Sequence, residues 1–471
     1  MAEPKQLIVN LFEMACVSHI THGLWTLPGN HRTRYKDLDY WTELAQTAES
    51  GGIDGIFLAD VIGTYDSFRN SHATAVREGM QIPNLDPLLL VPAMAAVTRH
   101  LGFGVTFSTT YEPPFAFARR MSTLDLLTRG RIGWNIVTSY LPNAARNFGL
   151  AGEVPHDKRY EIADEYLDVL YKLWEGSWDD DAVVADTEKR VYADPDKVRY
   201  INHEGENFRV AGPHLGEPSP QRTPLLFQAT GSPAGTAFAG KHAEVVFTGG
   251  RTSADFRRNA DTMRDAAERN GRSRDAIRFI AQAGVVVGRT DDEVSRRLEL
   301  YQRNTSVDGI LAHSGFPLDL PALPRDAVIA DVVTDAQRRD PRLASAIAAR
   351  STVGELIDDV AGSRHDRFFV AGTPSVVADE IETWLDETGL DGINLRQYHS
   401  YETLRDFTEL VVPELRKRGR MRDEYAPGET LRERVFGAGH ARLPEEHVGA
   451  RYRGGRNLEQ PAEPLRLAAQ A

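Results

Sequence analysis

Short apolar segments alternate with amphipathic segments along most of the chain. The apolar segments are rich in Val, Ile, Phe or Leu and are bounded by Gly, Pro, Asp or Ser, which is typical of parallel strands covered on both faces. Strands are predicted at Leu7–Phe12, Gly55–Ala59, Phe103–Ser108, Gly133–Ser139, Pro224–Ala229, Glu244–Gly249, Phe279–Gly288 and Gly392–Tyr398.

Apolar residues at helical spacing fill the stretches between these strands. Leu38–Ser50 shows this spacing, and Pro87–Arg99 follows Asp86 as a cap, with a proline in its first turn. Eight strands alternating with helices are typical of an α/β fold, the (β/α)8 TIM barrel, and favour it over a doubly wound sheet. Further helices are predicted at Arg119–Leu127, Lys158–Trp174, Ser232–His242, Ser253–Arg269 and Thr373–Glu387.

Two connections are too long for a simple barrel and predict insertions after strands four and seven. Residues 175–223 contain three consecutive Asp with several Pro and Gly, which indicates a hairpin-like insertion. Residues 290–370 are polar and rich in Arg and Asp, as in a functional lid or a disordered segment. We therefore expect one barrel domain over 1–455, followed by a tail at 456–471. The Arg-rich region after Val412 is predicted to pack on a neighbour in a homodimer or homotetramer.

Charge and cysteine content limit the kinds of molecule that the protein is expected to bind and the compartment in which it is expected to work. The net charge is -13, with no basic block, which argues against nucleic acid and against an anionic membrane surface. One cysteine in 471 residues excludes an intramolecular disulfide framework, as expected in a reducing compartment. No signal-peptide pattern begins the sequence, and no stretch approaches the ~18 apolar residues of a membrane span. A cytoplasmic protein is expected.

Polar and small residues follow several predicted strands, where a barrel carries its active site. Asp60 follows the second strand, Ser108 ends the third, and Asn135 and Ser139 lie at the end of the fourth. A cofactor cleft needs such residues. No GxGxxG follows a strand, so a Rossmann nicotinamide site is not indicated.

Two segments at helix starts could bind phosphate. Thr230, Gly231 and Ser232 precede a predicted helix, where glycine lets the backbone approach an anion and free N–H groups favour a negative charge. Ordinary helix capping by Ser232 is the favoured alternative on these residues alone. His156 and Tyr160 begin another helix, and capping there by the adjacent aspartate explains that segment equally well.

The stretch LFEMACVSHITHGLW, at residues 11–25, places the only cysteine beside two imidazoles. A zinc site is weakly indicated, because Cys16, His19 and His22 have no second ligand cluster. A Cys-His nucleophile is weakly indicated too, because no oxyanion-hole signature accompanies it. A buried structural thiol and the lining of a pocket therefore both remain open for Cys16.

Four long motifs carry a family resemblance. They are LFEMACVSHITHGLW, DYWTELAQTAESGGIDGIFLADVIGTYD, ARRMSTLDLLTRGRIGWNIVTS and HDKRYEIADEYL. The sequence resembles the two-component flavin monooxygenases of the bacterial-luciferase superfamily, in the nitrilotriacetate monooxygenase component A branch that includes long-chain alkane and dimethylsulfide monooxygenases. The resemblance runs from about residue 7 to residue 455.

This resemblance implies an FMNH2-dependent monooxygenase. Reduced FMN would bind as a dissociable cosubstrate, supplied by a separate NAD(P)H-dependent flavin reductase. O2 would give a C4a-(hydro)peroxyflavin that oxygenates a small apolar substrate, an alkane or an organosulfur compound, and no metal is implied. The protein would hold the flavin and exclude water. A deazaflavin-dependent oxidoreductase and a non-catalytic flavin-binding protein are the alternatives on the same fold.

The resemblance also assigns residues. His19 is implied as the group that handles the peroxide, and His22 is interpreted as structural. Packing remains an alternative for Tyr65 and Gln81. Tyr140 stands where the alkane enzyme has His and the dimethylsulfide enzyme has Tyr, which leaves the substrate open. The substrate-side residues implied are Cys16, His19, Tyr65, Gln81, Tyr140 and His313, and the FMN-binding residues are Asp60, Ser108, Asn135, Ser139, His156, Tyr160, Thr230, Gly231 and Ser232.

Overall fold

Eight parallel strands close into a ring in which each strand pairs with two neighbours. The computed structural model describes residues 5–250, 252–362 and 368–458. The ring order is β1-β2-β3-β4-β9-β10-β11-β13, and β13 returns to β1. The TIM barrel is confirmed, and the doubly wound sheet is excluded. The strands are β1 Ile8–Met14, β2 Gly55–Ala59, β3 Gly102–Ser108, β4 Ile132–Val137, β9 Leu225–Ala229, β10 Val245–Thr248, β11 Arg278–Val287 and β13 Gly392–Arg396.

Aromatic side chains fill the interior of the ring. The Phe57 ring lies 5.7 Å from those of Phe12 and Phe227 and 4.5 Å from that of Phe247, measured between centroids. A Cβ on Gly133 would come within 2.5 Å of the Phe227 ring, so glycine is needed there. Because this layer closes the barrel, a ligand must bind above it, at the ends of the strands.

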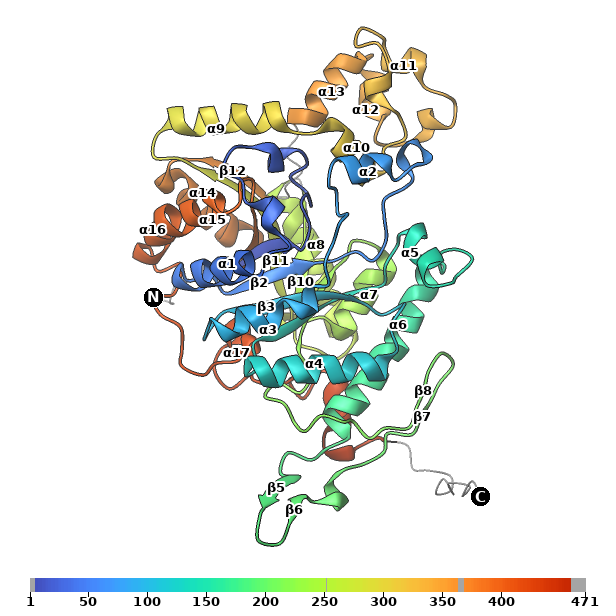
Figure 1. Cartoon of the computed structure of the whole chain (residues 1–471), viewed down its shortest axis with the longest axis vertical. Coiled ribbons are helices and arrows are strands. Elements are labelled where there is room, and N and C mark those ends of the chain that lie inside the picture. Colours follow the sequence, from blue (N-terminus) through green and yellow to red (C-terminus); the bar gives the residue numbers. More distant parts are fainter. Residues whose placement is uncertain (1–4, 251, 363–367, 459–471) are drawn as a thin grey trace.

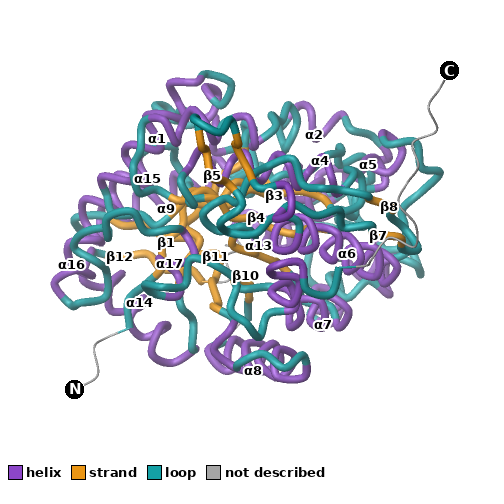
Figure 2. The backbone as a smooth tube through the Cα atoms, turned by 90° about the horizontal axis from the view of Figure 1, so that it is seen from below, coloured by secondary structure: helices purple, strands orange, loops and turns teal. Residues whose placement is uncertain are grey.

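Helices surround the ring on the outside (Figures 1 and 2). The predicted helix Pro87–Arg99 is wrong as one element: it is a 3-10 turn, Pro87–Leu89, followed by the short helix α3, because Pro92 supplies no N–H to a continuous helix. The predicted helix Leu38–Ser50 matches α1. The main covering helices are α1 Leu38–Ser50, α3 Val91–Ala96, α4 Pro114–Thr128, α6 His156–Tyr171, α7 Pro233–His242, α8 Ser253–Arg269, α14 Pro374–Thr388, α15 Glu402–Asp406 and α16 Val412–Lys417.

The two insertions lie at opposite ends of the molecule (Figure 1). The first holds two hairpins, β5 Val183–Asp186 with β6 Val191–Ala193 and β7 His203–Glu204 with β8 Arg209–Val210, as its composition predicts. The second is helical, and it shares an apolar cluster with the loops after β2 and β4, through residues such as Phe68 and Leu141. Its helices are α9 Asp291–Asn304, α10 Val307–Ser314, α11 Ile329–Val332, α12 Ala344–Ala348 and α13 Val353–Gly362.

One strand was not predicted. β12, Phe368–Gly372, pairs in parallel with Ala283–Val287, the far half of β11, outside the closed ring. The predicted insertion 290–370 ends inside this strand. β11 is long enough to pair with β10 and β13 through its first half and with β12 through its second. The division of the chain into one domain stays a prediction.

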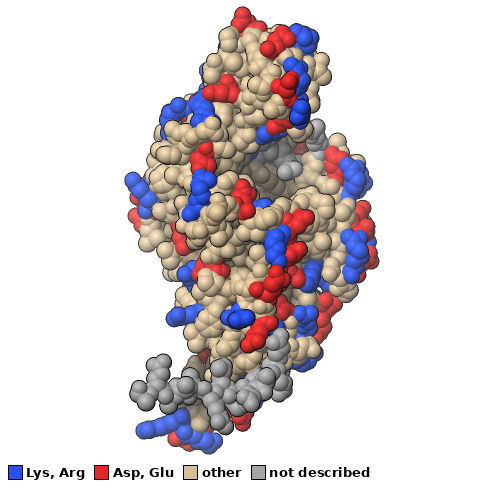
Figure 3. Space-filling view, turned by 90° about the vertical axis from the view of Figure 1, so that its right-hand side faces the viewer, with Lys and Arg blue, Asp and Glu red and all other residues tan. Residues whose placement is uncertain are grey.

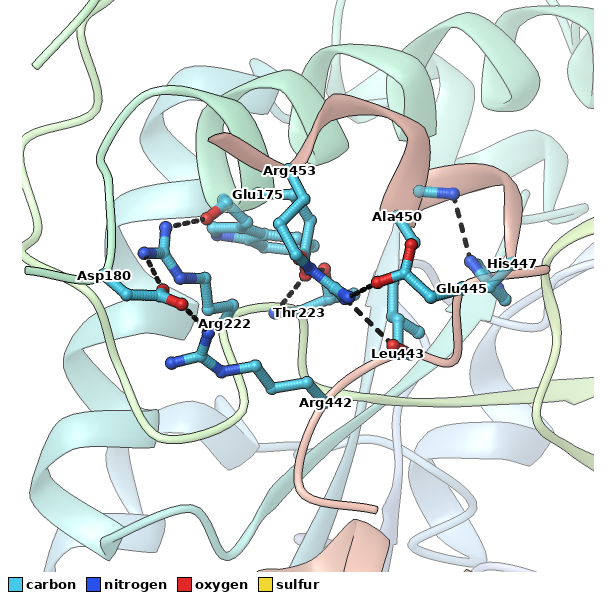
Figure 4. A network of polar contacts seen from close by, with 12 residues as sticks. Glu175, Asp180, Arg222, Thr223, Arg442, Leu443, Glu445, His447, Ala450 and Arg453 are labelled. Atoms are coloured by element: carbon cyan, nitrogen blue, oxygen red, sulfur yellow. Dashed lines mark hydrogen bonds and ion pairs between the residues drawn. The ribbon is translucent and has the colours of Figure 1, made fainter. Parts of the chain in front are cut away.

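The carboxyl-terminal arm packs on the barrel of its own chain. It contains α17 Leu431–Phe436 and a 3-10 segment, Val448–Gly455. In Figure 4, Arg453 reaches the buried Glu175 and also Glu445, with N–O distances of 3.4 and 2.6 Å. The predicted packing of this region on a neighbouring subunit is therefore not needed to bury it. Most of the predicted tail 456–471 lies outside the described residues.

Candidate active site

A cavity of about 320 Å³ opens at the carboxyl ends of β2, β4 and β9. Figure 3 shows a hollow in the surface below the helical insertion, on the side of the molecule where α5 (Pro142–Asn147) and α6 lie. Acidic and basic side chains are both found around it. Five predicted site residues line the cavity: Asp60, Ser139, Tyr140, His156 and Tyr160. Apolar walls come from Val61, Ile62, Leu141, Ala144 and Phe238.

The ends of β3 and β4 are tied together by hydroxyl groups. Ser139 Oγ donates to Ser108 Oγ at 2.8 Å, and the Ser139 backbone has a φ of 53°. Such left-handed backbone in a non-glycine residue is a strained conformation that clusters at functional sites. Asn135 donates through Nδ2 to Thr106 Oγ1 at 2.9 Å, while its buried Oδ1 has no partner in the described part of the chain. Asn135 therefore retains an unused acceptor near the mouth of the barrel.

Asp60 is held by an amide that was not predicted. Asn84 Nδ2 donates to Asp60 Oδ1 at 2.6 Å and faces the Val61 carbonyl oxygen at 3.2 Å. Burial raises the pKa of Asp60 to about 7. This carboxyl can therefore gain or lose a proton near neutral pH.

Cys16 is a buried thiol rather than a thiolate. Its Sγ donates to the Ser18 carbonyl oxygen at 3.4 Å, and its backbone bridges to Asn84. Burial raises the pKa of the thiol to about 12. This protonated state disfavours the Cys-His nucleophile.

The phosphate-side residues converge on the first turn of α7. Ser232 accepts a hydrogen bond from the Gly235 N–H at 3.1 Å, so it does cap the helix. A Cβ on Gly235 would lie 1.7 Å from Thr230 Oγ1 and 2.7 Å from Tyr160 Oη, which shows how closely these two hydroxyls approach the turn. Within the described ranges, the buried Thr230 Oγ1 has no partner and no atom lies within 4 Å of a Cβ placed on Gly231.

Two further predicted residues frame the cavity from α6. The His156 and Tyr160 rings lie 5.3 Å apart, and Tyr160 packs 5.5 Å from Phe238. His156 Nδ1 hydrogen-bonds Asp157 at 2.7 Å and remains half exposed. His156 therefore stands at the rim and Tyr160 deeper inside.

Arg159 also lines the cavity and was not predicted. It is 9% exposed, donates to the Ser139 carbonyl oxygen and lies 3.6 Å from Glu153. Its Nε has no partner among the residues that the structure describes. The sequence could have indicated that Arg159 is buried. Ala163 and Tyr166 follow it by four and seven residues, so all three lie on the buried stripe of α6. A buried cation on an apolar stripe indicates an anion nearby.

A second polar cluster joins four predicted substrate-side residues. Tyr65 and Tyr140 share a hydrogen bond between their hydroxyls at 2.5 Å, and the His313 ring meets Tyr65 edge-on at 5.1 Å. Gln81 Nε2 donates to His313 Nε2 at 3.0 Å. His22, interpreted from the sequence as structural, lies within hydrogen-bond distance of Nδ1, the other ring nitrogen of His313. These residues come from loops after β1, β2 and β4 and from α10.

His19 lies apart from this cluster. Its ring packs edge-on against Phe12 at 4.9 Å, and no hydrogen bond to the ring is seen within the described part of the chain. Burial, together with the positive charges of nearby groups, lowers the pKa of His19 well below its usual value. A neutral His19 can accept a proton or a hydrogen bond but does not begin as an acid.

The donor set fits a flavin mononucleotide better than a metal ion. Unused polar atoms of Asn135 and Gln228 lie near the end of the barrel, and Arg159 supplies a cation at the cavity. Thr230 and Gly231 line a neighbouring cavity that shares Ala229 with the first, and the start of α7 offers N–H groups for a phosphate there. Among the described residues, no group of three or more His, Cys, Asp or Glu could hold a metal ion. In the same residues, no helix is long and apolar enough to cross a membrane.

Comparisons with known proteins agree with this geometry. The family model "Luciferase-like monooxygenase" matches residues 17–392. A long-chain alkane monooxygenase of Geobacillus thermodenitrificans is 51% identical over 95% of this chain and 98% of its own. A dimethyl-sulfide monooxygenase of Hyphomicrobium sulfonivorans is 42% identical over 95% and 94%.

Solved structures extend the comparison. The crystal structure of a long-chain alkane monooxygenase superposes with a TM-score of 0.87, at 51% identity, covering 95% of this chain and 100% of that one. A riboflavin lyase solved with modified FMN and riboflavin has a TM-score of 0.83, at 37% identity over 95% and 100%. The chain therefore belongs to the luciferase-like, flavin-dependent monooxygenase family.

Proposed function

We propose that this protein is the oxygenase component of a two-component system, which uses reduced FMN and O2 to insert one oxygen atom into a small apolar substrate. The observation that carries the proposal is the cavity itself. At one side lie the buried Arg159 and the start of α6, and at the other an apolar wall that ends at Tyr140. Tyr140 connects this wall to the hydrogen-bonded cluster of Tyr65, His313 and Gln81. The first set suits a phosphate and the second a reaction that excludes water.

The flavin would be held by the residues already described. Arg159, Tyr160 and the amides before α7 would bind its phosphate, while Asn135 and Ser139 would support the ring system. Bound reduced FMN supplies the electrons that activate O2. Asp60, with its raised pKa, would hold or release a proton beside the ring.

The substrate would lie against the apolar side of the cavity. Val61, Ile62 and Leu141 line it, and the linked hydroxyls of Tyr65 and Tyr140 close one end. His313 and Gln81 approach that end through their own hydrogen bond. Such walls suit an alkane or an organosulfur compound, the classes named for the two similar monooxygenases above.

The proposal includes a partner. A separate NAD(P)H-dependent flavin reductase would supply FMNH2, as is typical of two-component relatives. The homodimer or homotetramer and the cytoplasmic location stay predictions.

A reductase-coupled assay tests the proposal. The protein, FMN, NADH and a general flavin reductase would be incubated under 18O2 with a series of alkanes and with dimethyl sulfide. We expect one labelled oxygen atom per product molecule and no product without reductase. An unlabelled product, or none under any condition, would contradict it.

Two alternative functions give different results in related measurements. A deazaflavin-dependent oxidoreductase would transfer hydride to its substrate in the absence of O2. A non-catalytic flavin-binding protein would bind FMN and yield no product with either reduced cofactor. Running the assay with both cofactors, aerobically and anaerobically, separates the three.

A further inference from the structure

His22 lies where the loop after β1 meets helix α10 of the second insertion. Its Nδ1 is 3.0 Å from Ser18 Oγ, and its Nε2 is 3.0 Å from His313 Nδ1. His313 Nε2 is in turn 3.0 Å from Gln81 Nε2. His22 is 2% exposed, so this chain of four side chains is shielded from bulk water.

The backbones around His22 approach each other unusually closely. A Cβ on Gly309, in α10, would lie 2.8 Å from His22 Cβ, and a Cβ on Gly23 would lie 2.3 Å from the Asn304 carbonyl oxygen. The Ser306 N–H donates to the His22 carbonyl oxygen at 2.9 Å. Because side chains at 23 and 309 would force the segments apart, glycine at both positions permits this docking.

The hydrogen bonds that link Gln81, His313, His22 and Ser18 all donate in one direction, from Gln81 toward Ser18. With the Gln81 amide nitrogen toward His313, its hydrogen points at Nε2, which must accept. The His313 proton then sits on Nδ1 and is donated to His22 Nε2. The remaining proton of His22, on Nδ1, is donated to Ser18 Oγ. Gln81 and His22 thus act from opposite sides of the ring to keep the proton on His313 Nδ1.

We propose that His22 is a positioning residue: it holds the ring of His313 in the orientation and tautomer that present Nε2 to Gln81 and the ring to Tyr65. The inference rests on the proposed function, in which His313 borders the substrate. It also explains how an inserted helix, almost 300 residues along the chain from His22, is fixed relative to the barrel. Loosening this contact would disturb His313 without touching the flavin side of the cavity.

Two replacements of His22 separate positioning from packing. The amide oxygen of glutamine reaches about as far as Nε2 and can accept the N–H of His313, whereas the amide nitrogen of asparagine reaches about as far as Nδ1 and can donate to Ser18. His22→Gln would therefore keep a partner for His313, and His22→Asn would keep only the partner for Ser18. We expect His22→Gln to stay within about threefold of wild type in kcat and His22→Asn to lose about tenfold or more, with KM for FMNH2 unchanged in both.

A readout independent of turnover accompanies the assay. In 15N-histidine NMR of the ligand-free protein, assigned by comparison with His313→Gln, we expect the Nδ1–H tautomer of His313 in wild type and in His22→Gln. A mixture of tautomers is expected in His22→Asn. If that variant does not fold, Gly309→Ala replaces it, because its Cβ would push α10 away from His22.

The outcomes are distinct. Equal losses of kcat in the two variants, with the same His313 tautomer in both, would overturn the proposal and leave His22 a packing residue. If wild type itself forms no oxygenated product, the proposed function fails. The NMR comparison then still decides whether His22 fixes the tautomer of His313.

Discussion

Two buried arginines, one at each end of the barrel, meet opposite surroundings. Arg432, at the amino-terminal end, donates to both carboxylate oxygens of Glu244, at 2.7 and 3.0 Å. Its remaining N–H groups reach the carbonyl oxygens of Thr223 and Ala441 at 2.8 and 2.9 Å. Arg159, at the carboxyl end, has one carbonyl oxygen and a carboxylate at 3.6 Å, and its Nε has no partner in the part of the chain that the structure describes.

This difference teaches how to interpret a buried charge. A guanidinium whose three nitrogens all donate to protein acceptors stabilises the fold, whereas one with an unused nitrogen beside a cavity is ready for an anionic ligand. The two positions agree with the general division of TIM barrels, in which the amino-terminal face serves stability and the carboxyl-terminal face serves chemistry.

The largest effect is expected at the amino-terminal end. Arg432→Met would leave the buried Glu244 without its cation, and removing one partner of such a pair costs about 3–5 kcal/mol of unfolding free energy. Urea denaturation would measure the loss. A loss below about 1 kcal/mol would show that Glu244 finds other partners and would weaken the comparison.

At the cavity, Arg159→Met should reduce the affinity for FMN and leave the free energy of unfolding largely unchanged. A lost charged hydrogen bond of about 1.5–3 kcal/mol corresponds to roughly 10- to 100-fold weaker FMN binding. Fluorescence titration with FMN and with riboflavin, which lacks the phosphate, gives the control. We expect FMN to lose its advantage over riboflavin in the variant. Equal weakening of both ligands would place Arg159 away from the phosphate.

A smaller, pH-dependent effect is expected at Asp60. Burial raises the pKa of Asp60 in the folded state from 3.8 to about 7. The protonated carboxyl therefore favours the folded state at low pH, and this stabilisation is lost as the pH rises from 3.8 to about 7. Asp60→Asn, which cannot ionise, should therefore gain stability relative to wild type across that window. We expect about 1–2 kcal/mol at pH 8 and less at pH 5. A difference independent of pH would show that Asp60 titrates normally.

The smallest effects distinguish two helix caps. Thr430 caps α17 at the amino-terminal end of the barrel, and Ser232 caps α7 beside Thr230 and Gly231 at the carboxyl-terminal end. Each change to alanine should cost about 1 kcal/mol of unfolding free energy. Only Ser232→Ala should also weaken FMN binding, in the same titration. Weakening by both variants would indicate a general loss of structure.

Much of the fold follows from local sequence patterns. The barrel strands are recognisable because both faces are buried, which leaves continuous apolar runs. β12 was not predicted because it lies outside the ring and only alternate residues of it are buried, and the predicted helix Pro87–Arg99 is interrupted ahead of Pro92. These errors arise where tertiary pairing or one proline overrides periodicity.

The site was less predictable. Strand-end residues such as Asp60 and Ser139 could be placed because a barrel brings the ends of its strands together. Asn84 and His22 could not, since their roles depend on partners from other loops, and those of His22 lie 4 and 291 positions away. No local spacing carries that information.

Rapid mixing of the protein–FMNH2 complex with oxygenated buffer tests whether the protein directs the reaction of bound reduced flavin with O2. We expect a transient flavin absorbance that outlasts the oxidation of free FMNH2 and that Arg159→Met weakens through lost binding. Oxidation of FMNH2 at the same rate with and without saturating protein, with no transient species, would contradict this expectation.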